Sequence, residues 1–243
     1  MLNEIAMAVI QAATEFLPVS SSGHLALFGN LVSAPNLFFI TFLHIASLLA
    51  VLIFVRKELL FLLKFNKESN KFLLYLILAT IPAAVVGYFF NDYIESVFSS
   101  YLFLAMAFFF TGCILLLTKI KVNPGKLGWK NSVLIGLFQA LALFPGVSRS
   151  GMTISIASLS GIERKKAAKF SFLLFIPLSI GAIILSFGEA YVSLSLIVAF
   201  IICFVLSLVF LNLLYLVIRK GNFWMFSFYC FLISIISLVL YFR

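Results

Sequence analysis

Six apolar runs, each long enough to cross a lipid bilayer, constrain the fold of this chain more than any other feature. They lie at roughly 37–55, 72–90, 101–118, 170–188, 194–218 and 223–242, and a membrane-spanning helix needs about 20 such residues. Hydrophobic residues form 64% of the chain and charged residues only 10%, whereas soluble domains carry about 25% charged residues. The sequence therefore predicts an all-α polytopic membrane protein and excludes a water-soluble enzyme.

Two further apolar regions, 1–33 and 133–160, are each interrupted near the middle by proline, glycine and a cluster of serines. The halves on either side of each interruption are too short to span a bilayer. Irregular backbone at membrane depth is tolerated only where protein or a water-filled cavity surrounds it. We therefore predict that both regions form re-entrant helical hairpins, which accompany the six transmembrane helices.

Lysine and arginine are concentrated in alternate connections between the spans, at 56–71, 119–132 and 161–169, and are absent from 91–100 and 189–193. By the positive-inside rule, the basic connections are cytoplasmic. The second hairpin then enters from the cytoplasm, while the first hairpin and both chain ends face outward. We therefore attribute the net charge of +9 to the basic connections that orient the protein in a bilayer, and we expect no nucleic-acid partner.

The two interrupted regions are copies of one motif. A shift of 128 residues aligns QAATEFLPVSSSG at 11–23 with QALALFPGVSRSG at 139–151, with seven of thirteen positions identical. Three predicted spans follow each copy, and because three is odd the second copy is inserted upside down. The sequence therefore predicts an inverted-topology repeat, with halves 1–118 and 119–243 in one membrane domain. Such repeats build their binding sites near the bilayer midplane.

Residues that differ between the two copies carry the chemistry. Charged groups inside membrane segments cost roughly 3 kcal/mol or more unless they are paired or hydrated, and they mark function. The second copy alone has a guanidinium, on Arg149. At three aligned positions the first copy alone has a carboxylate, a hydroxyl in place of that guanidinium, and an imidazole, on Glu15, Ser21 and His24.

Both hairpin tips are suited to bind an anion. A polar stretch that opens a helix exposes backbone N–H groups, and the helix dipole favours negative charge there. With the planar fork of Arg149, the tips form a candidate phosphate or diphosphate site. Glu15 then either binds a divalent cation or acts as a general base. The remaining candidate ligands at the tips are Ser20, Ser22, Gly23, Ser148 and Ser150.

Structural roles are the alternative for each of these groups. Glu15 and Arg149 could form an ion pair that only joins the hairpins. The tip serines could cap helices, and His24 could be a hydrogen-bonded packing residue. For His44, in the middle of the span at 37–55, we expect a structural role. A scaffold role and a catalytic role are equally compatible with the two glutamines that both copies share, Gln11 and Gln139.

The motifs QAATEFLPVSSSGH at 11–24 and FPGVSRSGMT at 144–153 resemble the two signature stretches of the undecaprenyl-diphosphate phosphatase family, the bacitracin resistance protein BacA family. FSFLLFIPLSIGA at 170–182 is similar to the stretch that follows in that family, and the order and spacing agree over nearly the whole chain. The resemblance implies six spans and two re-entrant hairpins in inverted repeat, as the charge pattern and the repeat predict independently.

The resemblance also implies a reaction, the hydrolysis of undecaprenyl diphosphate to undecaprenyl phosphate and inorganic phosphate. This reaction recycles the lipid carrier for peptidoglycan and other wall polymers and gives bacitracin resistance. It implies the bacterial cytoplasmic membrane, with the active site facing the periplasm, and a divalent cation, Mg²⁺ or Ca²⁺. The family's motifs fall here on Gln11, Glu15, Ser21, His24, Ser148, Arg149, Ser150 and Thr153.

Gln11 departs from the commoner glutamate of the family and removes one anionic ligand, so metal coordination by Glu15 and Gln11 is a weaker expectation. Ser21 is the candidate nucleophile with His24 as proton shuttle, and an activated water molecule is the alternative nucleophile. A carrier or flippase for an anionic polyprenyl phosphate lipid is the rival function, because inverted repeats are common in transporters. The oligomeric state, including a homodimer, stays open.

Overall fold

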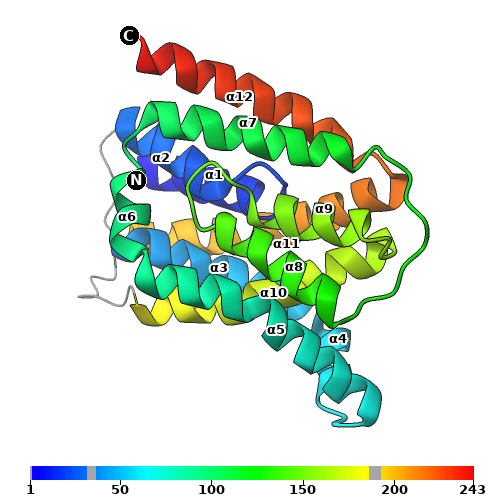
Figure 1. The fold of residues 1–243 in the computed structure, drawn as a ribbon. Helices are drawn as coiled ribbons and strands as arrows, with labels where there is room; N and C mark the ends of the chain where they lie inside the picture. The colour runs from blue at the N-terminus through cyan, green and yellow to red at the C-terminus, as the bar shows by residue number, and fades with distance from the viewer. Residues whose placement is uncertain (1, 32–36, 186–192) are drawn as a thin grey trace.

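The computed structural model describes residues 2–31, 37–185 and 193–243, and over these residues all regular structure is helical. The described elements are α1 (Leu2–Phe16), α2 (Ser21–Leu31), α3 (Leu37–Phe54), α4 (Arg56–Leu62), α5 (Lys67–Phe89), α6 (Asn91–Ser96), α7 (Tyr101–Leu117), α8 (Trp129–Leu141), α9 (Arg149–Leu159), α10 (Arg164–Leu185), α11 (Leu194–Lys220), the 3₁₀ turn η1 (Phe223–Met225) and α12 (Phe226–Tyr241) (Figure 1).

Four of these helical segments are long and apolar enough to cross a membrane, namely α5, α10, α11 and the η1–α12 segment. A fifth candidate span consists of α3 and α4, which meet at a bend of 72°. The remaining predicted run, at 101–118, forms α7, a shorter apolar helix of 17 residues. The prediction of an all-α polytopic membrane protein is therefore confirmed, while the count of six spans stays a prediction.

Helix ends differ from the predicted ones because capping groups, and not the apolar stretch alone, decide where a helix begins and ends. The run predicted at 72–90 begins earlier, since the side chain of Asn66 accepts a 2.8 Å hydrogen bond from the amide of Ser69. The run predicted at 194–218 ends at Gly221, which adopts the left-handed conformation with φ of 82°. Residues 186–188 of the fourth run lie outside the described residues.

Each interrupted region forms two short helices with an irregular tip between them, as predicted. In the first, α1 and α2 flank residues 17–20, where Pro18 precedes Ser20 with a positive φ of 67°. In the second, α8 and α9 flank residues 142–148, where Gly146 has a φ of 92°. Of the predicted regions, residues 1, 32 and 33 lie outside the described residues.

The two halves of the chain are interlocked. The first helix of each hairpin packs along a long helix of the other half, α1 along α11 and α8 along α5. The last helices of the two halves, α7 and α12, run side by side (Figure 1), and α3 contacts both α10 and α11. This reciprocal packing unites the chain in one helical body, and the inverted orientation of the repeat stays a prediction.

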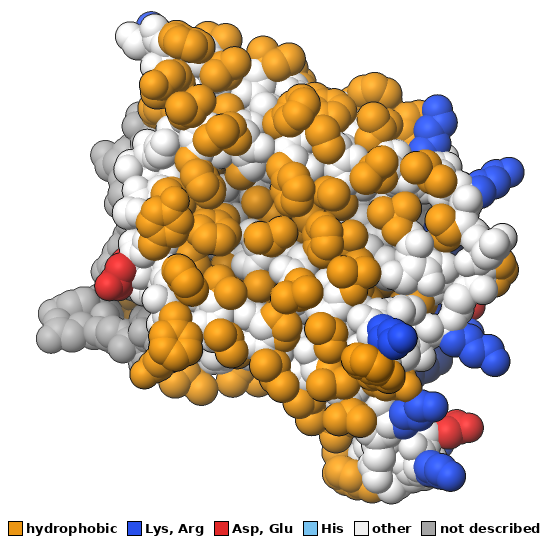
Figure 2. Space-filling model, in the orientation of Figure 1, with side chains coloured by type: hydrophobic (Ala, Val, Ile, Leu, Met, Phe, Trp, Pro, Cys, Tyr) orange, Lys and Arg blue, Asp and Glu red, His pale blue; other side chains and the backbone are white. Residues whose placement is uncertain are grey.

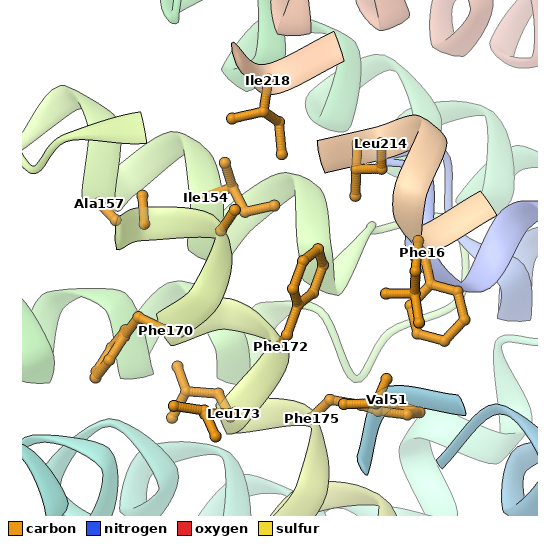
Figure 3. Close-up of a cluster of buried hydrophobic side chains, with 14 of the residues drawn as sticks. Phe16, Val51, Ile154, Ala157, Phe170, Phe172, Leu173, Phe175, Leu214 and Ile218 are labelled. Carbon is orange, nitrogen blue, oxygen red and sulfur yellow. The ribbon is translucent and has the colours of Figure 1, made fainter. Parts of the chain in front are cut away.

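Helix α10 supplies the aromatic centre of the largest core cluster. Figure 3 shows Phe170, Phe172 and Phe175 on this helix, among side chains from several other helices. Phe175 meets Phe16 of the first hairpin edge-to-face, with ring centroids 5.8 Å apart. Burying aromatic rings contributes strongly to packing, so this cluster holds α10 against the first hairpin tip.

The molecular surface matches a bilayer environment. Figure 2 shows hydrophobic side chains over most of one face, while most lysine and arginine side chains on that face lie at its right-hand end, from the connection between α7 and α8 down to α4 and the start of α5. Near that end, Lys169 of α10 donates to the carboxylate of Glu58 on α4. The segregation of charge agrees with the basic connections in the sequence, and which side of the membrane they occupy stays a prediction.

Candidate active site

A cavity of about 160 Å³ lies where the two hairpin tips meet α3 and α10. Both hairpins contribute to its wall, although they are far apart in the chain. Helix α3 adds His44, and α10 adds Phe175 and Ser179. The cavity is thus placed at the junction of the two repeat halves. The polar residues predicted from sequence that line it are Glu15, Ser20, Ser21, Ser22, Ser148 and Arg149.

The two tips are fastened to each other by hydrogen bonds. Ser20 Oγ accepts from the amide of Gly146 at 3.1 Å and from the amide of Gly23 at 3.3 Å. In return, Ser150 Oγ donates to the carbonyl of Leu17 at 3.3 Å. A β-carbon on Gly23 would lie 2.8 Å from the backbone of Gly146. The close approach of the tips therefore requires glycine at position 23, and Gly23 itself does not line the cavity.

Two helices begin at the cavity wall, α2 at Ser21 and α9 at Arg149. Within the described residues, the first two amides of each helix, on Ser21, Ser22, Arg149 and Ser150, have no acceptor. The first turn of a helix has unsatisfied N–H groups and a positive dipole end. Two helix N-termini at one cavity are suited to bind an anion, and the anion site expected at the tips stays a prediction.

Glu15 is the centre of the polar network. Its Oε1 accepts from Arg149 Nη2 at 2.9 Å, and its Oε2 accepts from Ser21 Oγ at 2.6 Å and from Gln11 Nε2 at 2.9 Å. The Glu15 side chain is only 7% exposed. These contacts connect the acidic motif, the serine motif and the arginine motif, so the structure brings together the groups that the sequence comparison singled out.

Arg149 is held in a fixed plane with most of its donors unused. Its guanidinium lies over the ring of Phe175, at 4.1 Å from the centroid. Within the described residues, its other guanidinium N–H groups have no acceptor besides Glu15. Stacking fixes the orientation of a guanidinium without using its N–H donors. Arg149 can therefore offer a planar fork to a phosphate group.

His24 faces away from the cavity, contrary to the expectation of a proton shuttle. Its Nδ1 lies 2.7 Å from the carbonyl of Ser20, and its Nε2 lies 2.8 Å from the hydroxyl of Tyr229. The imidazole also stacks on Tyr229, with centroids 5.6 Å apart. Both ring nitrogens are therefore engaged behind the tip. This position supports the packing role, and the shuttle role has no contact in its favour.

His44 lies in the cavity instead, although we expected it to be structural. Its Nε2 is 3.7 Å from Glu15 Oε2, and its Nδ1 is 2.9 Å from the carbonyl of Ile40. A carbonyl accepts only from a protonated nitrogen, so the hydrogen of neutral His44 sits on Nδ1 and Nε2 faces the carboxylate with a lone pair. An imidazole in the middle of an apolar span was the sequence signal for this site.

Two further polar residues, Thr153 and Ser179, lie near the cavity. Thr153 Oγ1 donates to the carbonyl of Arg149 at 2.9 Å and lies 2.6 Å from Ser171 Oγ on α10. It therefore supports the first turn of α9 without lining the cavity. Ser179, which the sequence analysis did not single out, lines the cavity from α10. It falls within the stretch 170–182 that resembles the family.

The donor set at the cavity decides how a divalent cation could bind. Within the described residues no three histidine, cysteine, aspartate or glutamate side chains gather as metal ligands. The one carboxylate on the cavity wall, Glu15, is balanced by Arg149. The buried Gln11 Oε1 has no hydrogen-bond partner. Mg²⁺ is commonly bound by one or two carboxylates plus substrate phosphates, so these residues fit a cation that arrives with a phosphate ligand.

The fold and the cavity together define a helical membrane protein with a polar cavity between the tips of two helical hairpins. The chain belongs to the BacA family, since the family model described as bacitracin resistance protein BacA matches residues 4–236. It is 39% identical to a protein named undecaprenyl-diphosphatase from Thermosipho africanus, over 97% of this chain and 98% of that protein.

Two more relatives carry related names. The chain is 37% identical to an undecaprenyl-diphosphatase from Methanococcus vannielii, over 96% of this chain and 98% of that protein. It is 35% identical to undecaprenyl-diphosphatase 2 from Bacillus thuringiensis, over 98% of this chain and 97% of that protein. The family recognised in the sequence motifs is thus confirmed by comparisons along nearly the full chain.

Proposed function

We propose that the protein is an undecaprenyl-diphosphatase, which hydrolyses undecaprenyl diphosphate to undecaprenyl phosphate and inorganic phosphate. The reaction recycles the lipid carrier of cell-wall polymer synthesis, and the family it belongs to is named for bacitracin resistance. One observation carries the proposal. An acid–base network of Glu15, Ser21 and Arg149 lies at a cavity where two helix N-termini meet.

Substrate binding follows from the electrostatics of the tips. The amides that begin α2 and α9 point their positive dipole ends at the terminal phosphate, and the fork of Arg149 binds its oxygens in a bidentate manner. As the phosphoryl group is transferred, charge spreads over its equatorial oxygens. Donors that are already fixed in place, such as a guanidinium stacked on Phe175, stabilise that charge without reorganisation.

Ser21 is the candidate nucleophile because its hydroxyl already donates to Glu15. Its Oγ forms a bond to the terminal phosphorus while Glu15 takes the hydroxyl proton. The bond from that phosphorus to the bridging oxygen breaks, and undecaprenyl phosphate leaves with the electron pair. Water then attacks the phosphoserine and releases inorganic phosphate and Ser21. The same carboxylate would equally activate a water molecule that attacks the phosphorus directly.

His44 is the candidate acceptor for the proton that Glu15 takes from the nucleophile. Its Nε2 lies 3.7 Å from Glu15 Oε2 and carries a lone pair when the imidazole is neutral, because Nδ1 then holds the hydrogen that faces the carbonyl of Ile40. A small side-chain shift would close this distance to a hydrogen bond, and the imidazole would then accept the proton from Glu15 and return it to the departing oxygen. A bound divalent cation, Mg²⁺ or Ca²⁺, would be held by Glu15 near Gln11 with the substrate's phosphate oxygens, and would supply charge neutralisation.

The site is proposed to face the outer side of the bacterial cytoplasmic membrane. The distribution of basic residues supports this orientation. The connections 56–71, 119–132 and 161–169 hold most of the lysine and arginine residues, and the positive-inside rule makes them cytoplasmic. The first hairpin then opens outward, where lipid diphosphate is released by polymer synthesis.

The test is phosphate release by the purified protein from undecaprenyl diphosphate, with and without a chelator. We expect multiple turnovers in the presence of Mg²⁺ or Ca²⁺ and a large loss with chelator. A parallel assay in vesicles would follow the movement of undecaprenyl phosphate between leaflets. Lipid movement without any release of phosphate would contradict the proposal and favour a carrier.

A further inference from the structure

A second, larger cavity adjoins the reaction cavity. It measures about 540 Å³ and lies between α5, α6 and α10. Leu143, Leu178 and Ala182 line both cavities, so the two spaces share a wall of apolar side chains. The second cavity is itself lined mostly by apolar residues. An apolar space therefore begins where the anion site ends.

This apolar space continues along the seam between α5 and α10. A third cavity of about 330 Å³ lies between α4, α5 and α10 and shares Thr80, Ala84 and Pro177 with the second. Ile77 and Ile81, on the wall of the third cavity, are about half exposed on the protein surface. Figure 1 shows α4 and α6 at opposite ends of α5. We call the second and third cavities, which adjoin one another from the wall of the reaction cavity to α4, the α5–α10 groove.

Two glycines in the groove wall have no other explanation in the packing. A β-carbon on Gly181 would meet nothing within 4 Å, and one on Gly87 would make only an ordinary contact with Leu143 at 3.5 Å. By contrast, a β-carbon on Gly136 would lie 2.6 Å from the carbonyl of Ala79, where α8 packs tightly on α5. A glycine inside a helix costs about 1 kcal/mol relative to alanine. The absence of a side chain at Gly181 leaves space open in the groove, and we take this space as the reason why glycine is used there despite its cost.

We propose that the α5–α10 groove binds the polyprenyl chain of the substrate and that Gly181 and Gly87 determine its access, an inference that rests on the proposed function. The chain is covalently joined to the diphosphate, so it must leave the reaction cavity through an apolar wall. The groove adjoins that cavity, is lined mostly by apolar residues and reaches the half-exposed Ile77 and Ile81 on the protein surface. Burial of each methylene in it stabilises a long chain more than a short one.

The experiment compares two substrates on three purified variants. Undecaprenyl diphosphate fills the groove, whereas dimethylallyl diphosphate places the same diphosphate in the reaction cavity with a single five-carbon unit that does not extend along the groove. Gly181→Leu fills the groove, and Gly87→Leu fills it from the facing helix. Gly128→Leu is the matched control, because a β-carbon there also meets nothing within 4 Å but lies outside the groove.

We expect Gly181→Leu to lower kcat/KM for undecaprenyl diphosphate by about tenfold or more, and to leave kcat/KM for dimethylallyl diphosphate within about twofold of the parent protein. Retained turnover of the short substrate also shows that the variant is folded. If Gly181→Leu is poorly folded, Gly87→Leu provides the same comparison. Gly128→Leu should match the parent on both substrates.

Two other results would contradict the proposal that the groove binds the polyprenyl chain. An equal loss on both substrates would mean that Gly181 acts on the diphosphate site, and parental turnover of undecaprenyl diphosphate by both leucine variants would mean that the chain lies elsewhere and membrane lipid fills the seam. If the parent protein released phosphate from neither substrate, the proposed function itself would fail.

Discussion

The Oε1 atom of Glu15 and the Nη2 atom of Arg149 lie 2.9 Å apart, although 134 residues separate them in the chain. Each belongs to a different copy of the repeated motif, at the point where the two hairpin tips are hydrogen-bonded to each other. A buried ion pair of this kind is a costly way to stabilise a fold. The pair lies on the wall of the cavity between the tips, and the proposed catalytic role accounts for this cost.

Arg149→Lys separates the charge of Arg149 from its geometry. Lysine keeps the positive charge but has no planar fork and does not stack on Phe175 in the same way. We expect kcat/KM for undecaprenyl diphosphate to fall by about 100-fold, with a thermal unfolding midpoint close to that of the parent. Hydrolysis at the parental rate would show that Arg149 serves only as a counter-charge to Glu15.

Ser21→Ala distinguishes a serine nucleophile from direct attack by water. If Ser21 forms a phosphoserine, its loss should lower kcat by about 1,000-fold or more. Ser99→Ala is the control, because Ser99 is exposed and does not line the reaction cavity. Acid quenching followed by mass spectrometry should detect phosphate on Ser21 of the parent protein. A small effect of Ser21→Ala, with no phosphoserine, would assign the attack to water.

His44→Asn tests the imidazole that faces Glu15. Asparagine is polar and of similar size, but it cannot accept and return a proton. We expect kcat to fall by about tenfold while KM and the thermal unfolding midpoint change little. Equal losses of kcat and of folded protein would indicate that His44 only supports α3, through its contact with Ile40.

Sidedness can be tested with single cysteines in a background that lacks Cys113, Cys203 and Cys230. Cysteines at Ser99 and Ser193, both exposed, should react with a membrane-impermeant thiol reagent in intact cells whose outer layer admits it. These two positions lie in or beside connections without lysine or arginine, which the positive-inside rule places outside.

Cysteines at Asn123 and Lys166, also exposed, should react only after the membrane is opened. Their connections are rich in lysine and are therefore expected in the cytoplasm. The opposite labelling pattern would show that the protein has the reverse orientation in the membrane. A role in recycling carrier lipid on the outer leaflet would then be untenable, although the chemistry of Glu15 and Arg149 would be unaffected.

The interrupted helices and the meeting of Glu15 with Arg149 could be predicted from the sequence because a repeat relates positions directly. Two aligned motifs place their polar residues at equivalent points of two hairpins, and charges inside apolar segments must find each other. The contact of Ser21 with Glu15 follows from the same hairpin. These predictions needed no knowledge of how distant helices pack.

The sequence did not predict that His44 lines the cavity and that His24 lies outside it. These positions depend on packing between helices of different segments. His24 turns away because Tyr229, on the last helix, offers it a partner at 2.8 Å. His44 reaches Glu15 only because α3 packs against both α10 and α11. The alignment of the repeat contains neither fact, since it specifies positions along the hairpins and not the helices that surround them.

The most direct measurement for the central claim is phosphate release from undecaprenyl diphosphate by purified Glu15→Gln, over a series of Mg²⁺ and Ca²⁺ concentrations. Glutamine is nearly isosteric and can still bond Ser21 and Arg149, so the variant should fold as the parent does. We expect kcat to fall by about 1,000-fold or more, because no carboxylate remains to take the proton from the nucleophile. Partial rescue by high metal would assign Glu15 a ligand role in addition. Phosphate release near the parental rate at every metal concentration would contradict the account.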